Sequence, residues 1–182
     1  DFSKKRKLDR VRDIFLIGCY TGLRFSDLSQ LKYDNIGGDG TITVKTVKTG
    51  KTVVIPIHTV LRTILAKYNN ELPKMLSNQK FNDYIKEVTK AAGIDESIFL
   101  QTTKGGLSYT ETVPKYSLVT SHTARRSFAT NAFLAGVPTI SIMKITGHKT
   151  ESAFMKYIKI SDKENAIQLK AHKFFNQMVV SK

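Results

Sequence analysis

The chain has 182 residues, of which 41% are hydrophobic and 9% aromatic, enough to build one sizeable core, so we expect a single domain over residues 1–182. Lysine and arginine outnumber acidic residues by 29 to 15, and the formal net charge of +14 favours nucleic acid as a partner and disfavours self-association. The sequence contains no apolar run of about 18 residues and no long basic amphipathic stretch, which argues against a membrane protein.

The single cysteine and the N-terminal residues bear on the compartment. Cys19 has no internal disulfide partner, and its place among apolar residues at helical spacing indicates a core side chain. Residues 1–7 are basic, but no hydrophobic cleavage segment follows them, so they do not form a secretory signal. Both features fit a protein of the reducing cytoplasm. With nucleic acid as its partner, we expect it to be associated with the nucleoid. Because the chain begins with Asp1, we expect it to be excised from a longer protein.

Apolar residues recur at helical spacing from Leu8 and stop at Gly22, which predicts a first helix ending there because glycine adopts the left-handed conformation easily. A short helical turn is expected at residues 24–31. Residues 41–47 and 52–56 then alternate between apolar and polar side chains, which predicts a β-hairpin with Lys48 near its tip.

Two further helices are expected, at residues 60–68 and 81–92, with Pro73 between them. Residues 94–120 mix Gly, Ser, Thr and Pro with few periodic apolar residues, which predicts a long surface connection. Long loops of this kind in compact domains are often functional.

The C-terminal third is predicted to be helical. Ser121 is expected to cap a helix that ends at Gly136 and carries His122 and Arg125 in its first turn. Pro138 suits the opening of the next helix, which stops before Gly147, and a short helix from about residue 151 follows. The capping-box pattern at residues 161–164 opens a last helix, over residues 161–178. Its apolar side consists of Ile167, Ala171, Phe174, Phe175 and Met178.

The residues that could carry chemistry suggest phosphodiester cleavage. Such cleavage without a metal requires a nucleophile, cationic donors for the non-bridging oxygens and an acid for the departing oxygen. His122 and Arg125 are three residues apart at the start of a helix, so they share one face near the positive end of the helix dipole. Taken alone, a pair with this spacing is more often part of a solvated basic helix face.

Several such motifs occur together in one order. They are Thr21-Gly22-Leu23-Arg24, Lys48 in the hairpin, His122-Thr123-Ala124-Arg125, Gly147-His148, and Tyr157 nine residues beyond His148. The ordered set resembles the tyrosine recombinase, or phage integrase, family, over about residues 11–160. Each motif is common by itself, and the joint pattern is specific.

The resemblance implies a role for each of these residues. Arg24 and Arg125 would hold the scissile phosphate, and His122 and His148 would donate hydrogen bonds to it. Tyr157 would attack the phosphorus to form a 3′-phosphotyrosine, and Lys48 would protonate the leaving 5′-oxygen. This chemistry of DNA breakage and rejoining requires neither ATP nor a metal ion, so no cofactor is expected.

The resemblance also implies a fold and partners. The expected fold is mainly α-helical with a small antiparallel sheet near residues 41–57, like the catalytic domain of the family. The partner would be double-stranded DNA, clamped on its other face by upstream DNA-binding domains. The full-length protein would act as a tetramer, while this chain alone would be monomeric. The helix at residues 161–178 would dock either on a neighbouring protomer or on its own domain.

Two assignments within the site stay open at this stage. Lys45 and Lys51 are rivals of Lys48, because one residue of register changes which side chain faces the phosphate. Lys48 is favoured because it precedes Pro56 by eight residues, as the lysine of the family commonly does. Asp27 is expected to orient the Arg24 guanidinium, or else to form an ordinary surface ion pair.

Two other functions remain as alternatives. A type IB topoisomerase uses a closely related set of groups to relax supercoils. A catalytically silent module would bind DNA by charge and shape alone, although a pure binder has no need of a nucleophile at this spacing from a histidine. The four histidines and one cysteine lack the close spacing of a zinc site.

Overall fold

The computed structural model describes residues 6–158, 160–170 and 172–176. In chain order the elements are helices α1 (Arg6–Thr21) and α2 (Phe25–Leu28), the 3-10 helix η2 (Tyr33–Asn35), strands β1 (Thr41–Lys45) and β2 (Thr52–Pro56), helices α3 (Thr59–Lys67) and α4 (Asn78–Ala91), strands β3 (Ser97–Lys104) and β4 (Leu107–Pro114), the 3-10 helix η3 (Lys115–Leu118), and helices α5 (Ser121–Leu134), α6 (Thr139–Thr146), α7 (Glu151–Ile158), α8 (Asp162–Lys170) and α9 (Lys173–Asn176). The mainly helical fold with antiparallel strand pairs is therefore confirmed.

The first hairpin agrees with the sequence pattern. β1 pairs antiparallel with β2 in a register that runs from Thr41 opposite Pro56 to Lys45 opposite Thr52. The alternating apolar side chains of both strands are buried, as the period-two pattern requires. Lys48 lies in the turn between the strands.

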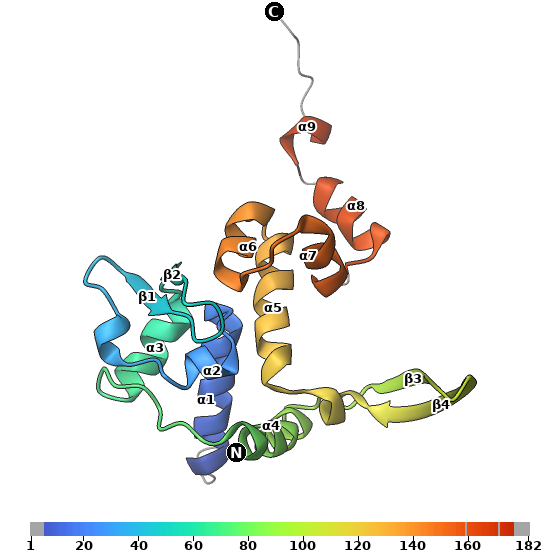
Figure 1. Ribbon diagram of the computed structural model, residues 1–182, viewed down its shortest axis with the longest axis horizontal. Helices are drawn as coiled ribbons and strands as arrows, with labels where there is room; N and C mark the ends of the chain where they lie inside the picture. Colours follow the sequence, from blue (N-terminus) through green and yellow to red (C-terminus); the bar gives the residue numbers. More distant parts are fainter. Residues whose placement is uncertain (1–5, 159, 171, 177–182) are drawn as a thin grey trace, which may run out of the picture.

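The expectation of a long loop at residues 94–120 is wrong. β3 and β4 pair over eight residues each and form a second hairpin, which projects from the body of the molecule (Figure 1). Threonine and valine favour extended backbone, and Gly105 and Gly106 both adopt positive φ, as a two-residue hairpin turn requires. The threonines of the two strands and the Gly105-Gly106 pair were therefore the sequence signal for this hairpin.

The buried apolar residues form two clusters. The larger one is built by α1, α3, α4 and the β1–β2 hairpin, and the smaller one by α5, α6 and α7. Helix α5 also packs against α1 (Figure 1). A Cβ placed on Gly18 of α1 would lie only 3.0 Å from the Cβ of Ala124 on α5, so small residues allow the two helices to approach closely. The loop that follows α1 is thereby held beside the first turns of α5.

Helix boundaries in the C-terminal half are close to those expected. The capping residue of α5 is Thr120, whose backbone N–H donates to the hydroxyl of Thr123 in a capping box, so the predicted cap at Ser121 is off by one residue. Gly147 ends α6 with φ of +66°, the left-handed conformation that glycine adopts without strain.

The predicted single helix at residues 161–178 is divided in the structure. The capping box between Ser161 and Glu164 is present, and α8 ends at Lys170 before the short α9 begins. Ala171 and Met178 of the predicted apolar side lie outside the described residues. The other three side chains, Ile167, Phe174 and Phe175, are 60% to 67% exposed and so are not packed on their own domain. None of the helices in the described ranges is long and apolar enough to cross a membrane.

Gly22 provides a stability test, because its backbone has φ of +65° and a Cβ there would lie 2.3 Å from the Phe128 ring. Gly50 has the same φ and open space around it. We expect Gly50→Ala to destabilise the chain by about 1–2 kcal/mol through backbone strain. Gly22→Ala should cost about 1–3 kcal/mol more, because the added methyl also overpacks the α1–α5 contact. Urea unfolding measures both changes, and equal losses would contradict the packing argument.

Candidate active site

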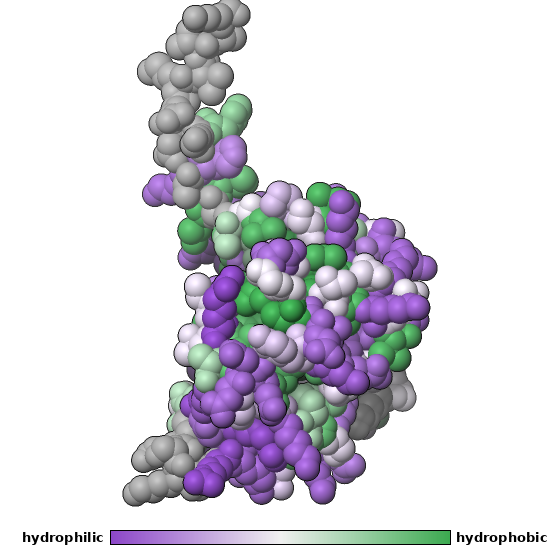
Figure 2. All heavy atoms as spheres, turned by 90° about the vertical axis from the view of Figure 1, so that its left-hand side faces the viewer, coloured by the Kyte–Doolittle hydropathy of each residue, from purple (hydrophilic) through white to green (hydrophobic). Residues whose placement is uncertain are grey.

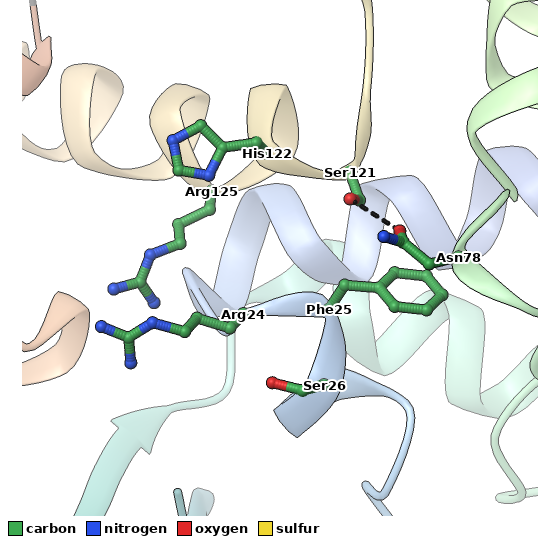
Figure 3. Close-up of a pocket in the computed structure, with 7 residues that line it drawn as sticks. All are labelled: Arg24, Phe25, Ser26, Asn78, Ser121, His122 and Arg125. Atoms are coloured by element: carbon green, nitrogen blue, oxygen red, sulfur yellow. Dashed lines mark hydrogen bonds between the residues drawn. The ribbon is translucent and has the colours of Figure 1, made fainter. Parts of the chain in front are cut away.

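Four segments that are distant in the sequence bring the predicted catalytic residues together. Arg24 precedes α2, His122 and Arg125 lie in the first turns of α5, His148 follows α6, and Tyr157 lies on α7. Arg24, His122 and Arg125 line one cavity of about 440 Å³ (Figure 3). In this view the guanidinium groups of Arg24 and Arg125 extend in the same direction. Two arginines at one cavity form a suitable site for a phosphate.

Arg125 is the most buried of these side chains, with 5% exposure. Its guanidinium donates hydrogen bonds to the carbonyl of Gly22, at 2.6 Å, and to the carbonyl of Thr146. Burial, and then the nearby charge of Arg24, lower the pKa of Arg125 to about 10, so it remains a cation at neutral pH. One side chain therefore ties the loop after α1 and the end of α6 to α5.

Tyr157 lies among cationic and imidazole groups. Its ring centroid is 5.2 Å from that of His122 and 4.7 Å from that of His148, and the Arg126 guanidinium lies 5.4 Å from it. The hydroxyl is buried and makes no hydrogen bond of standard geometry to a described residue, but it lies close enough to the Arg125 guanidinium to interact with it. Burial raises the pKa of Tyr157, while Arg125 and Arg126 act in the opposite direction. The phenol is therefore neutral at physiological pH.

Both histidines of the site have lowered pKa values. Desolvation lowers the pKa of His122 most, followed by the charges of Arg126, Arg125 and Arg24. Burial likewise lowers the pKa of His148, with contributions from Arg125, Arg24 and His122. Like charges and desolvation both disfavour the imidazolium, so both rings are neutral at physiological pH in the absence of a bound anion.

The structure does not bring Lys48 into the cavity with the arginines. Lys48 is exposed at the hairpin turn. A second hollow, of about 690 Å³, lies between the hairpin and α6, and its lining includes Arg24, His148 and Lys51. Figure 2 shows the side of the molecule that carries the β1–β2 hairpin. Apolar surface lies near the middle of this face and is surrounded by hydrophilic residues. Of the three candidate lysines, Lys51 lines this second hollow, whereas Lys45 and Lys48 do not.

Asp27 is buried, with 1% exposure, and does not bond to Arg24 as the sequence suggested. Its Oδ1 accepts a hydrogen bond of 2.8 Å from the backbone N–H of Val47, and its Oδ2 is buried without a hydrogen-bond partner among the described residues. Asp27 thus connects α2, next to Arg24, to the residue that precedes Lys48. This contact anchors the lysine hairpin to the site.

Two residues around the site were not singled out from the sequence. Arg126 lies over the Tyr157 ring, and its Nε is buried without a hydrogen-bond partner among the described residues. The hydroxyl of Thr146 lies 2.8 Å from Nδ1 of His148. Arg126 could have been noticed, since it directly follows the His-x-x-Arg motif, whereas the role of Thr146 depends on how α6 ends. The described part of the chain contains no group of three or more His, Cys, Asp or Glu side chains placed to hold a metal ion.

The chain belongs to the phage integrase family, whose sequence profile matches residues 2–164. The tyrosine recombinase XerD of Listeria monocytogenes serotype 4b (strain F2365) is 28% identical to it over 142 residues, which cover 78% of this chain and 47% of the relative. A crystal structure of XerA recombinase superposes with a TM-score of 0.60 at 19% identity, covering 91% of this chain and 63% of the other. XerH site-specific recombinase, bound to a palindromic difH substrate in a post-cleavage complex, gives a TM-score of 0.59 at 18% identity, with 89% and 45% covered. The chain spans about half the length of the curated relatives it matches.

The lowered pKa values of His122 and His148 predict that stability falls in mild acid. In the unfolded chain these imidazoles titrate near a pKa of about 6.5. Below that pH the unfolded state takes up protons that the folded state does not, so the free energy of unfolding decreases until the lower folded pKa values are reached. Urea unfolding at pH 7.5 and pH 5.5 should show this decrease, and a His122→Gln/His148→Gln variant should show a smaller one. The same pH dependence in both proteins would refute the linkage.

Proposed function

We propose that this chain is the catalytic domain of a site-specific tyrosine recombinase. It would cleave one DNA strand through Tyr157, hold the 3′-phosphate as a phosphotyrosine, and rejoin it to the 5′-hydroxyl of a partner strand. The observation that carries the proposal is the position of Tyr157, whose ring lies near those of His122 and His148 and which interacts with the charges of Arg24 and Arg125. Membership of the phage integrase family supports the same chemistry.

The geometry suggests how the groups divide the work. Arg24 and Arg125 would bind the non-bridging oxygens of the scissile phosphate and stabilise the charge that develops on them. Because Arg125 is held by two carbonyl groups, its position is fixed before DNA arrives. As the Tyr157 oxygen bonds to phosphorus, the bond to the 5′-oxygen breaks and that oxygen takes a proton from the acid, Lys48 in our assignment. The phosphotyrosine conserves the bond energy for rejoining.

Double-stranded DNA is the proposed substrate and partner. The net charge of +14 favours electrostatic binding to its phosphates. XerH recombinase, which shares this fold, is in complex with its difH DNA substrate. We further propose that the full-length protein assembles as a tetramer on DNA and that the exposed side chains of α8 and α9 contact a neighbouring protomer there.

Covalent trapping tests the proposed reaction. The chain is incubated with duplex DNA that carries a nick near the cleavage site, so that the released short strand diffuses away and rejoining is prevented. We expect a covalent protein–DNA adduct on a denaturing gel, and none with Tyr157→Phe, since that variant lacks the attacking oxygen. Tyr20→Phe is the matched control and should form the adduct normally, because Tyr20 stacks on His58 away from the site. An adduct formed by Tyr157→Phe would refute the assignment.

A sulfur-substituted substrate identifies the acid. Lys48→Ala should leave Tyr157 able to attack, while the 5′-oxygen departs slowly without a proton. Sulfur at this bridging position removes the need for an acid, because a thiol has a pKa of only about 8.5. The sulfur substrate should therefore restore cleavage to Lys48→Ala and not to Tyr157→Phe. Rescue of Lys51→Ala in place of Lys48→Ala would move the acid to the residue that lines the hairpin–α6 hollow.

A further inference from the structure

Thr146, the last residue of α6, contacts two predicted catalytic residues. Its side chain is fully buried, and its hydroxyl lies 2.8 Å from the carbonyl oxygen of Ile142 and 2.8 Å from Nδ1 of His148. Its own carbonyl accepts a hydrogen bond from Arg125. Thr146 therefore joins His148 to the residue that holds the site together.

The two contacts of the hydroxyl determine where its hydrogen lies. A hydroxyl has one hydrogen to donate. If it pointed to Nδ1, the hydroxyl and carbonyl oxygens would face each other at 2.8 Å with no hydrogen between them, so the hydrogen points to the Ile142 carbonyl. This bond to the carbonyl four residues earlier is common for threonine in helices. The hydroxyl oxygen then accepts a hydrogen bond from Nδ1–H of His148. In the neutral ring the remaining nitrogen, Nε2, carries a lone pair.

His148 is therefore a proton acceptor placed beside the Tyr157 phenol, whose other polar neighbour, Arg125, can only donate. Burial and the charges of Arg125, Arg24 and His122 lower the pKa of His148, which favours the neutral ring. Its ring centroid is 4.7 Å from that of Tyr157, whose buried hydroxyl makes no hydrogen bond of standard geometry to a described acceptor. The charged and titratable groups that face Tyr157 are Arg24, His122, Arg125, Arg126 and His148.

His122 differs from His148 in this respect. Its ring lies slightly farther from Tyr157, at 5.2 Å between centroids. No hydrogen bond to another described residue determines which of its nitrogens carries the hydrogen. The structure thus defines the tautomer of one of the two histidines only.

We propose that Thr146 is a positioning residue that holds His148 in the Nδ1–H form, so that Nε2 accepts the phenolic proton of Tyr157 during attack. The inference rests on the proposed function. As the Tyr157 oxygen bonds to phosphorus, its proton passes to Nε2, and the bond from phosphorus to the 5′-oxygen breaks. The resulting imidazolium can donate a hydrogen bond to a non-bridging oxygen, which combines proton transfer with charge stabilisation. In the rejoining step the proton returns to Tyr157.

Substitution of Thr146 tests the proposal. Thr146→Val removes the hydroxyl but keeps the size of the side chain and the carbonyl that Arg125 uses, and Thr146→Ser keeps the hydroxyl. Nitrogen NMR of the imidazole groups in the DNA-free chain reports the tautomer. We expect the Nδ1–H form of His148 in the wild type and in Thr146→Ser, and a shift towards the Nε2–H form in Thr146→Val.

Single-turnover formation of the covalent adduct on nicked DNA gives the kinetic readout. We expect Thr146→Val to slow this step by about 10–100-fold, the usual loss when a supporting hydrogen-bond partner is removed. Its acidic limb in the pH–rate profile should move to lower pH, because the hydroxyl no longer stabilises the imidazolium. Thr146→Ser should retain most of the wild-type rate and the wild-type pH profile.

Thr89→Val is the matched control. Thr89 is buried in α4, and its hydroxyl donates to the Ile85 carbonyl at 2.8 Å, the same bond as in Thr146 but with no histidine beside it. This variant should cleave at the wild-type rate. An equal loss in Thr89→Val, an unchanged tautomer in Thr146→Val, or a changed tautomer without loss of rate would each overturn the proposal. A wild-type chain that forms no adduct would instead refute the proposed function, while the NMR measurement would still decide the tautomer.

Discussion

The active site depends on the hydrogen bonds of Arg125 to the carbonyl groups of Gly22 and Thr146. Each of these carbonyls lies at the end of a helix, where backbone groups lack partners within the helix itself. The guanidinium satisfies both and still lines the pocket that we propose binds the phosphate. Replacement of Arg125 would therefore remove a proposed phosphate ligand and also leave buried acceptors unpaired, which costs more than the loss of the bonds themselves. A substitution of Arg125 would therefore affect the stability of the fold and the proposed phosphate binding together.

The site gathers more positive charge than its surroundings balance. The charge of Arg24 lowers the pKa of Arg125, and both cations lower the pKa values of the two histidines. Asp27 is buried nearby and offsets part of this charge at Arg125. A bound phosphate would relieve the repulsion and raise the pKa values of both imidazoles, which makes each ring a stronger proton acceptor than in the free site. The free site is arranged in advance for an anionic ligand.

Much of this could be predicted from the sequence, and the failures have physical causes. The β1–β2 hairpin followed from strict alternation, and the helices α1, α4 and α5 followed from their apolar spacing. The β3–β4 hairpin was missed because both of its faces are largely exposed, so alternation carries no burial signal there. The capping box fixed the start of α8 but contained no information on where the helix ends. The partners of Asp27 and of Thr146 depend on how distant segments pack, which local spacing does not encode.

The partners of Arg125 lie far from it in the sequence, and this distance affects the order in which the site forms during synthesis. Arg125 bonds to a carbonyl 103 residues before it and to another 21 residues after it. Contacts with such separations close late in folding, because their loop-closure entropy must be offset by structure already formed. During translation, which runs from the N-terminus, the Gly22 carbonyl and the arginine exist long before Tyr157 on α7 leaves the ribosome. A chain that ends before α7 would thus contain both partners of the Gly22–Arg125 contact but would lack the tyrosine that we propose as the nucleophile.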